Sequence, residues 1–178
     1  MHQRAAVILV SLLLLGTPLP GFADNGLAAS EALEASIQKR LLDGEFTEKT
    51  KNFGWSASGC QISGYPILER SLALDPSGNV RRFVQKQIVS HGSIDTIRSY
   101  FDEAGTLRLV DHELGSTVDR VFLDPSGQIV KSIVSHDARK TWRDASFELS
   151  DYFMRPSSAA GARSTFLKEE PTCEPSAG

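Results

Sequence analysis

Three of the four histidines in this 178-residue sequence are spaced in a way that could bring them to one metal ion. His91, His112 and His136 fall at the same end of alternate segments that favour β-strands. Alternate strands of a flat sheet lie about 9.6 Å apart, whereas zinc ligands bind about 2.0–2.1 Å from the ion. A shared ion would need a strongly curled sheet, so the spacing favours polar residues that recur because a hairpin recurs. We predict no metal site and no cofactor.

Two Ser-His pairs are the residues that best fit hydrolytic chemistry. Ser90 precedes His91, and Ser135 precedes His136. Neighbouring side chains of a strand point to opposite faces, so neither pair can act as nucleophile and base unless a turn redirects it. The sequence also lacks a Gly-x-Ser-x-Gly elbow and a His-Glu-x-x-His motif. This favours a non-enzymatic protein, with a small secreted hydrolase that uses His91 or His136 in a concave sheet face as the alternative.

Carboxylates recur as well, because Asp75, Asp102 and Asp124 each open a frame of the form apolar-Asp-x-x-Gly. Calcium prefers 6–8 oxygen ligands, and each frame offers one carboxylate. Asp favours the first position of a type I turn, and Gly accepts the left-handed conformation of the bulge that follows. We therefore expect each frame to be the tip of a β-hairpin. Glu113 and Glu148 could form an acid/base pair, although no local motif marks them.

Two of the frames resemble known hairpin repeats. Phe-Asp-Glu-Ala-Gly-Thr-Leu at 101–107 and Phe-Leu-Asp-Pro-Ser-Gly-Gln-Ile at 122–129 are similar to repeats of the tyrosine-aspartate (YD or RHS) type and to variant MORN repeats. Where the first type has Tyr before Asp, this sequence has Leu74, Phe101 and Leu123. The resemblance covers about 60 residues. It implies a meander of hairpins and carries no catalytic residue.

The elements around these tips predict the α+β class, with an N-terminal helix packed on a roughly seven-stranded antiparallel β-meander. A helix is expected at about 27–43, because Leu33, Ile37 and Leu41 recur at four-residue intervals. It should cover one face of the sheet and leave the other face solvated. Leu107 and Leu109 should share a face. The strands are expected at 65–74, 79–90, 94–101, 106–114, 117–123, 128–135 and 140–149.

The N-terminal segment of the chain predicts export. Residues 1–23 have the basic start, apolar run and small residues of a signal peptide, cut after Ala23. The apolar run of residues 5–15 spans about 16 Å as a helix, well short of about 30 Å of hydrocarbon. We therefore expect a periplasmic or secreted protein without a stable membrane anchor. Residues 24–149 should form one domain, followed by a loose C-terminal tail at 150–178.

The two cysteines, Cys60 and Cys173, are expected to form one disulfide in an oxidising compartment. Such a bridge would pin the C-terminal tail to the start of the sheet. Two free buried thiols, or an intermolecular bridge through Cys173, are the alternatives.

Partner classes follow from charge and from one aromatic cluster. The net charge is −3 and no segment has a basic excess, so nucleic acid is not an expected partner. Trp142 with Arg139 and Arg143 has the composition of a contact patch on an edge strand; the alternative is a core tryptophan with outward charges. We expect an exported binding protein of the cell envelope or extracellular space. The expected partner is another protein or an envelope component. Binding could take two routes: a partner strand added to an exposed sheet edge, or a ligand held in the concave face if the sheet curls.

Overall fold

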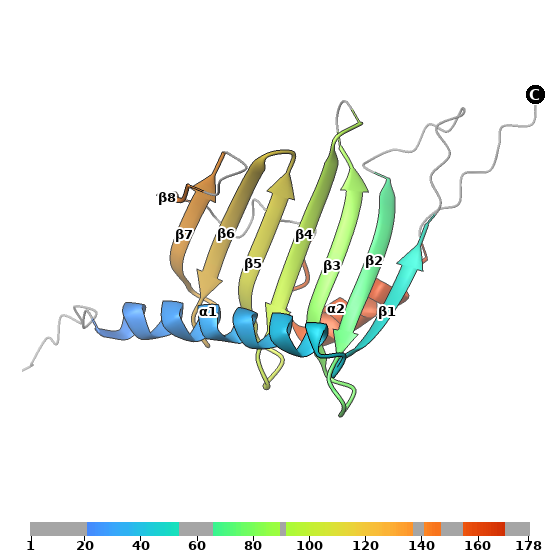
Figure 1. Ribbon diagram of the computed structural model, residues 1–178, viewed down its shortest axis with the longest axis horizontal. Coiled ribbons are helices and arrows are strands. Elements are labelled where there is room, and N and C mark those ends of the chain that lie inside the picture. Colours follow the sequence, from blue (N-terminus) through green and yellow to red (C-terminus); the bar gives the residue numbers. More distant parts are fainter. Residues whose placement is uncertain (1–20, 54–65, 90–91, 137–140, 147–154, 170–178) are drawn as a thin grey trace, which may run out of the picture.

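The computed structural model describes residues 21–53, 66–89, 92–136, 141–146 and 155–169. The helix α1 (Gly21–Leu42) runs across one face of an eight-stranded antiparallel sheet, and the short helix α2 (Ala159–Leu167) lies on the opposite face (Figure 1). The α+β class and the position of the N-terminal helix are therefore confirmed. No helix within the described ranges combines the length and the apolar character needed to cross a membrane.

The sheet follows the order of the chain, β1 to β8, and each strand pairs antiparallel with the next. This confirms the meander. Among the described residues the sheet is open, with β1 at one edge and β8 at the other. Its strands are β1 (Thr47–Asn52), β2 (Ile67–Leu74), β3 (Val80–Ile88), β4 (Ile94–Phe101), β5 (Leu107–Leu114), β6 (Thr117–Leu123), β7 (Ile129–Ser135) and β8 (Arg143–Asp144).

The described part of the chain has one strand more than the sequence predicted. The strand β1, Thr-Glu-Lys-Thr-Lys-Asn, lies between the predicted helix and the first predicted strand. It carries no apolar residue because it is exposed on both faces, so it gives no alternating hydrophobic signal. At the other edge, β8 has only two residues, where a strand was expected over 140–149, a range that lies partly outside the described residues.

The three Asp-x-x-Gly frames form hairpin tips, as predicted. In each, the glycine N–H donates to the aspartate carbonyl, and the glycines have φ of 82°, 79° and 84° at Gly78, Gly105 and Gly127. Each tip is followed by a β-bulge that adds one residue to the outgoing strand. The bulge shifts the alternation of side chains, so Leu107 and Leu109 belong to different hydrophobic clusters. The prediction that they share a face was wrong.

Both faces of the sheet carry a helix, which corrects two predictions. The face expected to be solvated packs against α2, and the range 150–178, expected to be a loose tail, contains that helix. The side chain of Ser158 caps its N-terminus, and Ala162 and Phe166 pack on the sheet at four-residue spacing. Only Ala162 and Phe166 of its nine residues are buried, and Ala159 packs partly buried beside them, so the periodic signal in the sequence is weak.

Polar contacts fix α1 on its face of the sheet in addition to its apolar packing. Ser30 Oγ donates to the carbonyl of Leu123 at 3.2 Å, and Gln38 Nε2 donates to the Tyr100 hydroxyl at 2.9 Å. Most of the predicted signal peptide lies outside the described residues. Its predicted cut after Ala23 falls three residues into α1, before any of these contacts.

Candidate functional site

His112 is held between two carboxylates on neighbouring strands. Its Nε2 lies 2.7 Å from Asp95 Oδ1 on β4, and its Nδ1 lies 3.1 Å from Asp119 Oδ2 on β6. Burial would lower the pKa of His112, but its hydrogen bonds to the two carboxylates and their charges outweigh this and raise the pKa to about 9. The imidazolium is thus charged at neutral pH and cannot accept a proton there. Its role is a charged link between three strands.

This link continues as a row of polar side chains across the α2 side of the sheet. Gln87 Nε2 donates to Asp95 at 2.7 Å, and Gln85 Oε1 accepts from Arg70 Nε at 3.0 Å. Arg70 also donates to main-chain carbonyls at the end of α2, one of them that of Thr165. Because Gln85 Nε2 also donates to Gln87 Oε1 at 3.4 Å, the row connects α2 to β6 through side chains that are buried or half-buried, a role that no local sequence motif indicates.

The other candidates for hydrolysis do not form a catalytic group among the described residues. Ser135 is buried, whereas His136 is exposed, with its Nδ1 3.4 Å from Thr117 Oγ1. Glu113 pairs with Arg98 at 2.9 Å. Ser90, His91 and Glu148 lie outside the described residues, as do both ends of the predicted disulfide, Cys60 and Cys173. A search of the described part of the chain found no cluster of three or more potential metal ligands.

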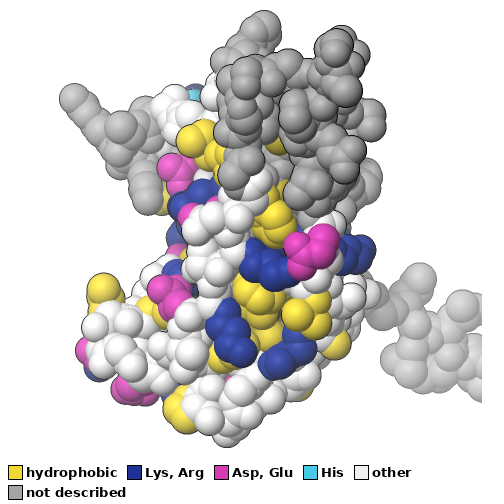
Figure 2. All heavy atoms as spheres, turned by 90° about the vertical axis from the view of Figure 1, so that its right-hand side faces the viewer, with side chains coloured by type: hydrophobic (Ala, Val, Ile, Leu, Met, Phe, Trp, Pro, Cys, Tyr) yellow, Lys and Arg dark blue, Asp and Glu magenta, His cyan; other side chains and the backbone are white. Residues whose placement is uncertain are grey.

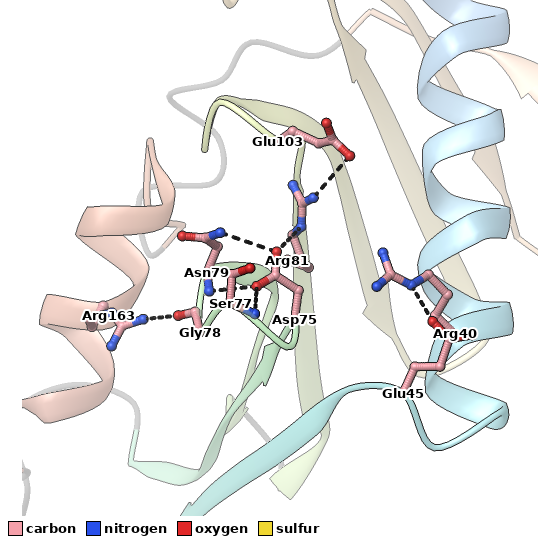
Figure 3. A network of polar contacts seen from close by, with 9 residues as sticks. All are labelled: Arg40, Glu45, Asp75, Ser77, Gly78, Asn79, Arg81, Glu103 and Arg163. Carbon is pink, nitrogen blue, oxygen red and sulfur yellow. Dashed lines mark hydrogen bonds and ion pairs between the residues drawn. The ribbon is translucent and has the colours of Figure 1, made fainter.

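The aspartates of the hairpin tips use their carboxylates to hold the turns. Asp75 Oδ1 accepts the main-chain N–H of Ser77 at 3.0 Å and that of Asn79 at 2.9 Å (Figure 3). Burial would raise the pKa of Asp75, but these hydrogen bonds and the charge of Arg81 lower it. Asp102 and Asp124 accept N–H groups in the same way. This satisfies the carboxylates internally, as turn chemistry predicted.

An arginine closes two of the three tips, and the sequence analysis missed it. Arg81 Nε lies 3.1 Å from Asp75 Oδ2, and Arg108 Nη1 lies 3.3 Å from Asp102 Oδ2. Each arginine stands six residues after its aspartate and is the extra residue of the bulge. The recurrence Asp-x-x-Gly-x-x-Arg was legible in the sequence. Val130 takes this position in the third tip.

A hollow of about 340 Å³ lies between the tips of the β2–β3 and β4–β5 hairpins and the N-terminus of α2. Its polar groups already serve the fold. Ser158 Oγ accepts the N–H of Gly161, the N–H of Ala159 donates to the carbonyl of Gly105, and Arg163 donates to the carbonyl of Gly78 (Figure 3). We interpret the hollow as the joint that fixes α2 to the hairpin tips.

The predicted Trp142 patch lies only partly within the described residues. Trp142 is half-buried, and the guanidinium of Arg120 on β6 lies over its ring at 5.3 Å. Arg120 also donates to Glu34 of α1 at 2.5 Å. Arg143 is exposed on β8, and Arg139 lies outside the described residues. The described contacts of Trp142 therefore bind it to the sheet.

The edge strand β1 offers main-chain groups to a partner. Phe53 N donates to the carbonyl of Leu68 at 3.0 Å, so Phe53 and Leu68 form a hydrogen-bonded pair at the end of the β1–β2 ladder. Such pairs alternate along an antiparallel ladder, and every second residue of β1 therefore directs its N–H and C=O away from β2. These residues are Glu48, Thr50 and Asn52.

The two sides of β1 differ in charge. Lys49 and Lys51 lie on the α2 side, where Lys51 Nζ is 2.6 Å from Glu169 Oε1 and 3.4 Å from the carbonyl of Leu167. On the α1 side, Glu48 is bound by Arg82 of β3 at 2.5 Å. Viewed from this edge, lysine and arginine side chains surround a hydrophobic patch (Figure 2).

Both helices end near this edge and expose a leucine there. α1 leads into β1 after Leu42, which is 88% exposed, and Leu167 at the end of α2 is 64% exposed. Because Lys51 donates to the carbonyl of Leu167, α2 ends beside β1.

Comparisons with protein-family models, with curated proteins and with solved structures each found no match. The likeness to YD and MORN repeats consequently rests on the hairpin frame alone.

Proposed function

We propose that this protein is an exported, non-enzymatic interaction protein of the cell envelope or extracellular space. It binds an extended segment of another protein, which joins the sheet as a strand beside β1. The observation that carries this proposal is the open edge of β1, where three residues direct main-chain donors and acceptors away from the sheet. Main-chain hydrogen bonds supply affinity in such strand addition, and side-chain contacts supply specificity.

The composition of β1 fits a selective site. Edge strands commonly carry lysine, which discourages pairing with arbitrary strands. Here Lys49 and Lys51 are both on one side, so a partner must match that side to bind. The opposite edge offers a much shorter strand to a partner, because β8 has only two residues, which pair with Ile133 and Val134 of β7.

The side chains best suited to acid–base chemistry hold the fold together, which supports a non-enzymatic role. His112 is held charged between Asp95 and Asp119, and Asp75 and Asp102 bind the turns of their own hairpins. Each of these groups therefore has a structural task. The signal-peptide pattern of residues 1–23 supports export.

A matched pair of variants tests strand addition. Thr50→Pro removes an outward N–H but no bond to β2, and proline is tolerated on an edge strand whose N–H faces solvent. Thr50→Ala keeps the N–H. Crosslinking in the exported fraction should recover a stoichiometric partner with the natural protein and with Thr50→Ala. Loss of that partner in Thr50→Pro, with an unchanged melting temperature, is the expected result. Equal recovery with both variants would contradict the proposal.

Export and catalysis have separate tests. Mass spectrometry of the exported protein should show a chain that begins at Asp24, and retention of residues 1–23 would contradict cleavage.

A screen of ester, glycoside and peptide substrates should show no turnover. Turnover that disappears in His136→Ala would instead favour the secreted hydrolase.

A further inference from the structure

We infer that the segment that binds β1 carries acidic side chains at alternate positions, which face Lys49 and Lys51. The inference rests on the proposed strand addition and specifies its partner. Lys49 and Lys51 are two positions apart, so they project from the same side of β1. A strand beside β1 would place every second side chain on that side, directly opposite or diagonal to these lysines.

The two lysines are available to a partner. Lys49 is exposed and has no ion-pair partner within the described ranges. Lys51 is half-buried, because its Nζ also donates to the Leu167 carbonyl and lies 5.8 Å from the centre of the Phe166 ring. Its ion-pair partner Glu169 has a side chain that is 82% exposed, so a carboxylate of the partner can replace that of Glu169. The pair with Glu169 also shows that a carboxylate fits on this side of the edge.

The same geometry disfavours a second copy of this chain as the occupant. Two β1 strands that paired antiparallel through their outward residues, centred on Thr50, would place Lys49 of one copy opposite Lys51 of the other. A shift by one hydrogen-bonded step would place Lys49 against Lys49 or Lys51 against Lys51. Like charges directly opposite each other destabilise an antiparallel pair. The lysines therefore select against self-pairing and in favour of an acidic partner.

On the α1 side of the edge, the side chains of the partner meet different groups. Glu48 is already neutralised by Arg82, and its neighbour on the same side, Thr50, is uncharged. Side chains of the partner that face this side need no charge. The expected segment thus alternates acidic residues with uncharged residues such as threonine or valine.

Two labelled ten-residue peptides test the inference on the full chain. One alternates threonine with glutamate, and the other alternates threonine with lysine. In fluorescence anisotropy at low salt, the glutamate peptide should bind about tenfold more tightly, because cross-strand pairs of opposite charge are favourable and like pairs are not. Added salt should reduce this preference. The double variant Lys49→Glu, Lys51→Glu should prefer the lysine peptide.

The outcomes separate the inference from the proposed function. Equal binding of the two peptides, binding of neither, or an unreversed preference in the double variant would overturn the acidic partner. Strand addition itself fails if Thr50→Pro binds the glutamate peptide as tightly as Thr50→Ala does. Analytical ultracentrifugation should show a monomer, whereas a dimer that Thr50→Pro disrupts would identify a second copy as the occupant and overturn the inference.

Discussion

The centre of the sheet and its β1 edge share the same antiparallel pairing, but the centre is buried and the edge is exposed to solvent. Phe83, Tyr100 and Leu109 on β3, β4 and β5 are fully buried, and helices cover both faces near them. Five of the six residues of β1 are exposed, and its outer main-chain groups face away from the sheet. The centre therefore supplies the free energy of folding. The edge contributes little to stability, so its residues are free to serve recognition.

The largest expected difference concerns core packing. Phe83→Ala should lower the free energy of unfolding by about 3–5 kcal/mol, because it leaves a cavity in the cluster beneath α2. Urea denaturation measures this loss. A loss below about 1 kcal/mol, within the range of surface substitutions, would mean that the centre is not the stable part of the molecule.

The next effect is the pH dependence of the half-buried His112 link. The pKa of His112 is raised from 6.5 to about 9 in the folded protein. Its stabilising contribution is therefore fully present below about pH 6.5 and is lost as the pH rises through about 9. The free energy of unfolding should fall on the order of 2–3 kcal/mol across this window. His112→Gln should flatten the profile; an unchanged profile in this variant would contradict the assignment.

A smaller effect should distinguish two hairpin tips. Gly127→Ala places an alanine at φ 84° in open space, which costs about 1–2 kcal/mol. Gly105→Ala has a similar φ, but its Cβ would lie 3.2 Å from Ala159 Cβ at the start of α2. Thermal unfolding should therefore show the greater loss for Gly105→Ala. Equal losses would indicate that α2 does not pack tightly on this tip.

The smallest effect on stability is expected at the edge itself. Lys49→Ala should change the free energy of unfolding by no more than about 0.5 kcal/mol, because the side chain is exposed. The same variant should bind the glutamate peptide more weakly, as measured by anisotropy. A large loss of stability without a loss of binding would reverse the contrast between centre and edge.

Turn chemistry and periodicity were sufficient to predict most of the architecture. Asp75, Asp102 and Asp124 marked the tips because the type I turn and its bulge need those residue types. The strand β1 could not be predicted, because an edge exposed on both faces has no alternating pattern. The helix α2 buries too few residues to show a strong periodic pattern.

The candidate site was less predictable than the fold. His112 was singled out, but its contacts with Asp95 and Asp119 depend on the register of three strands, which spacing alone does not fix. The contact between Trp142 and Arg120 of β6 likewise depends on how the strands are placed beside one another. The recognition features of β1 arise from its position at the edge, so they became visible only with the sheet order.

The most direct test of the edge as the binding site is amide hydrogen exchange followed by NMR, with and without the glutamate peptide. The N–H groups of Glu48, Thr50 and Asn52 should become protected on binding, because they gain acceptors in the added strand. Those of Lys49 and Lys51 face β2 and should change little. Protection that bypasses these three amides, or appears instead along β7, would contradict strand addition at β1.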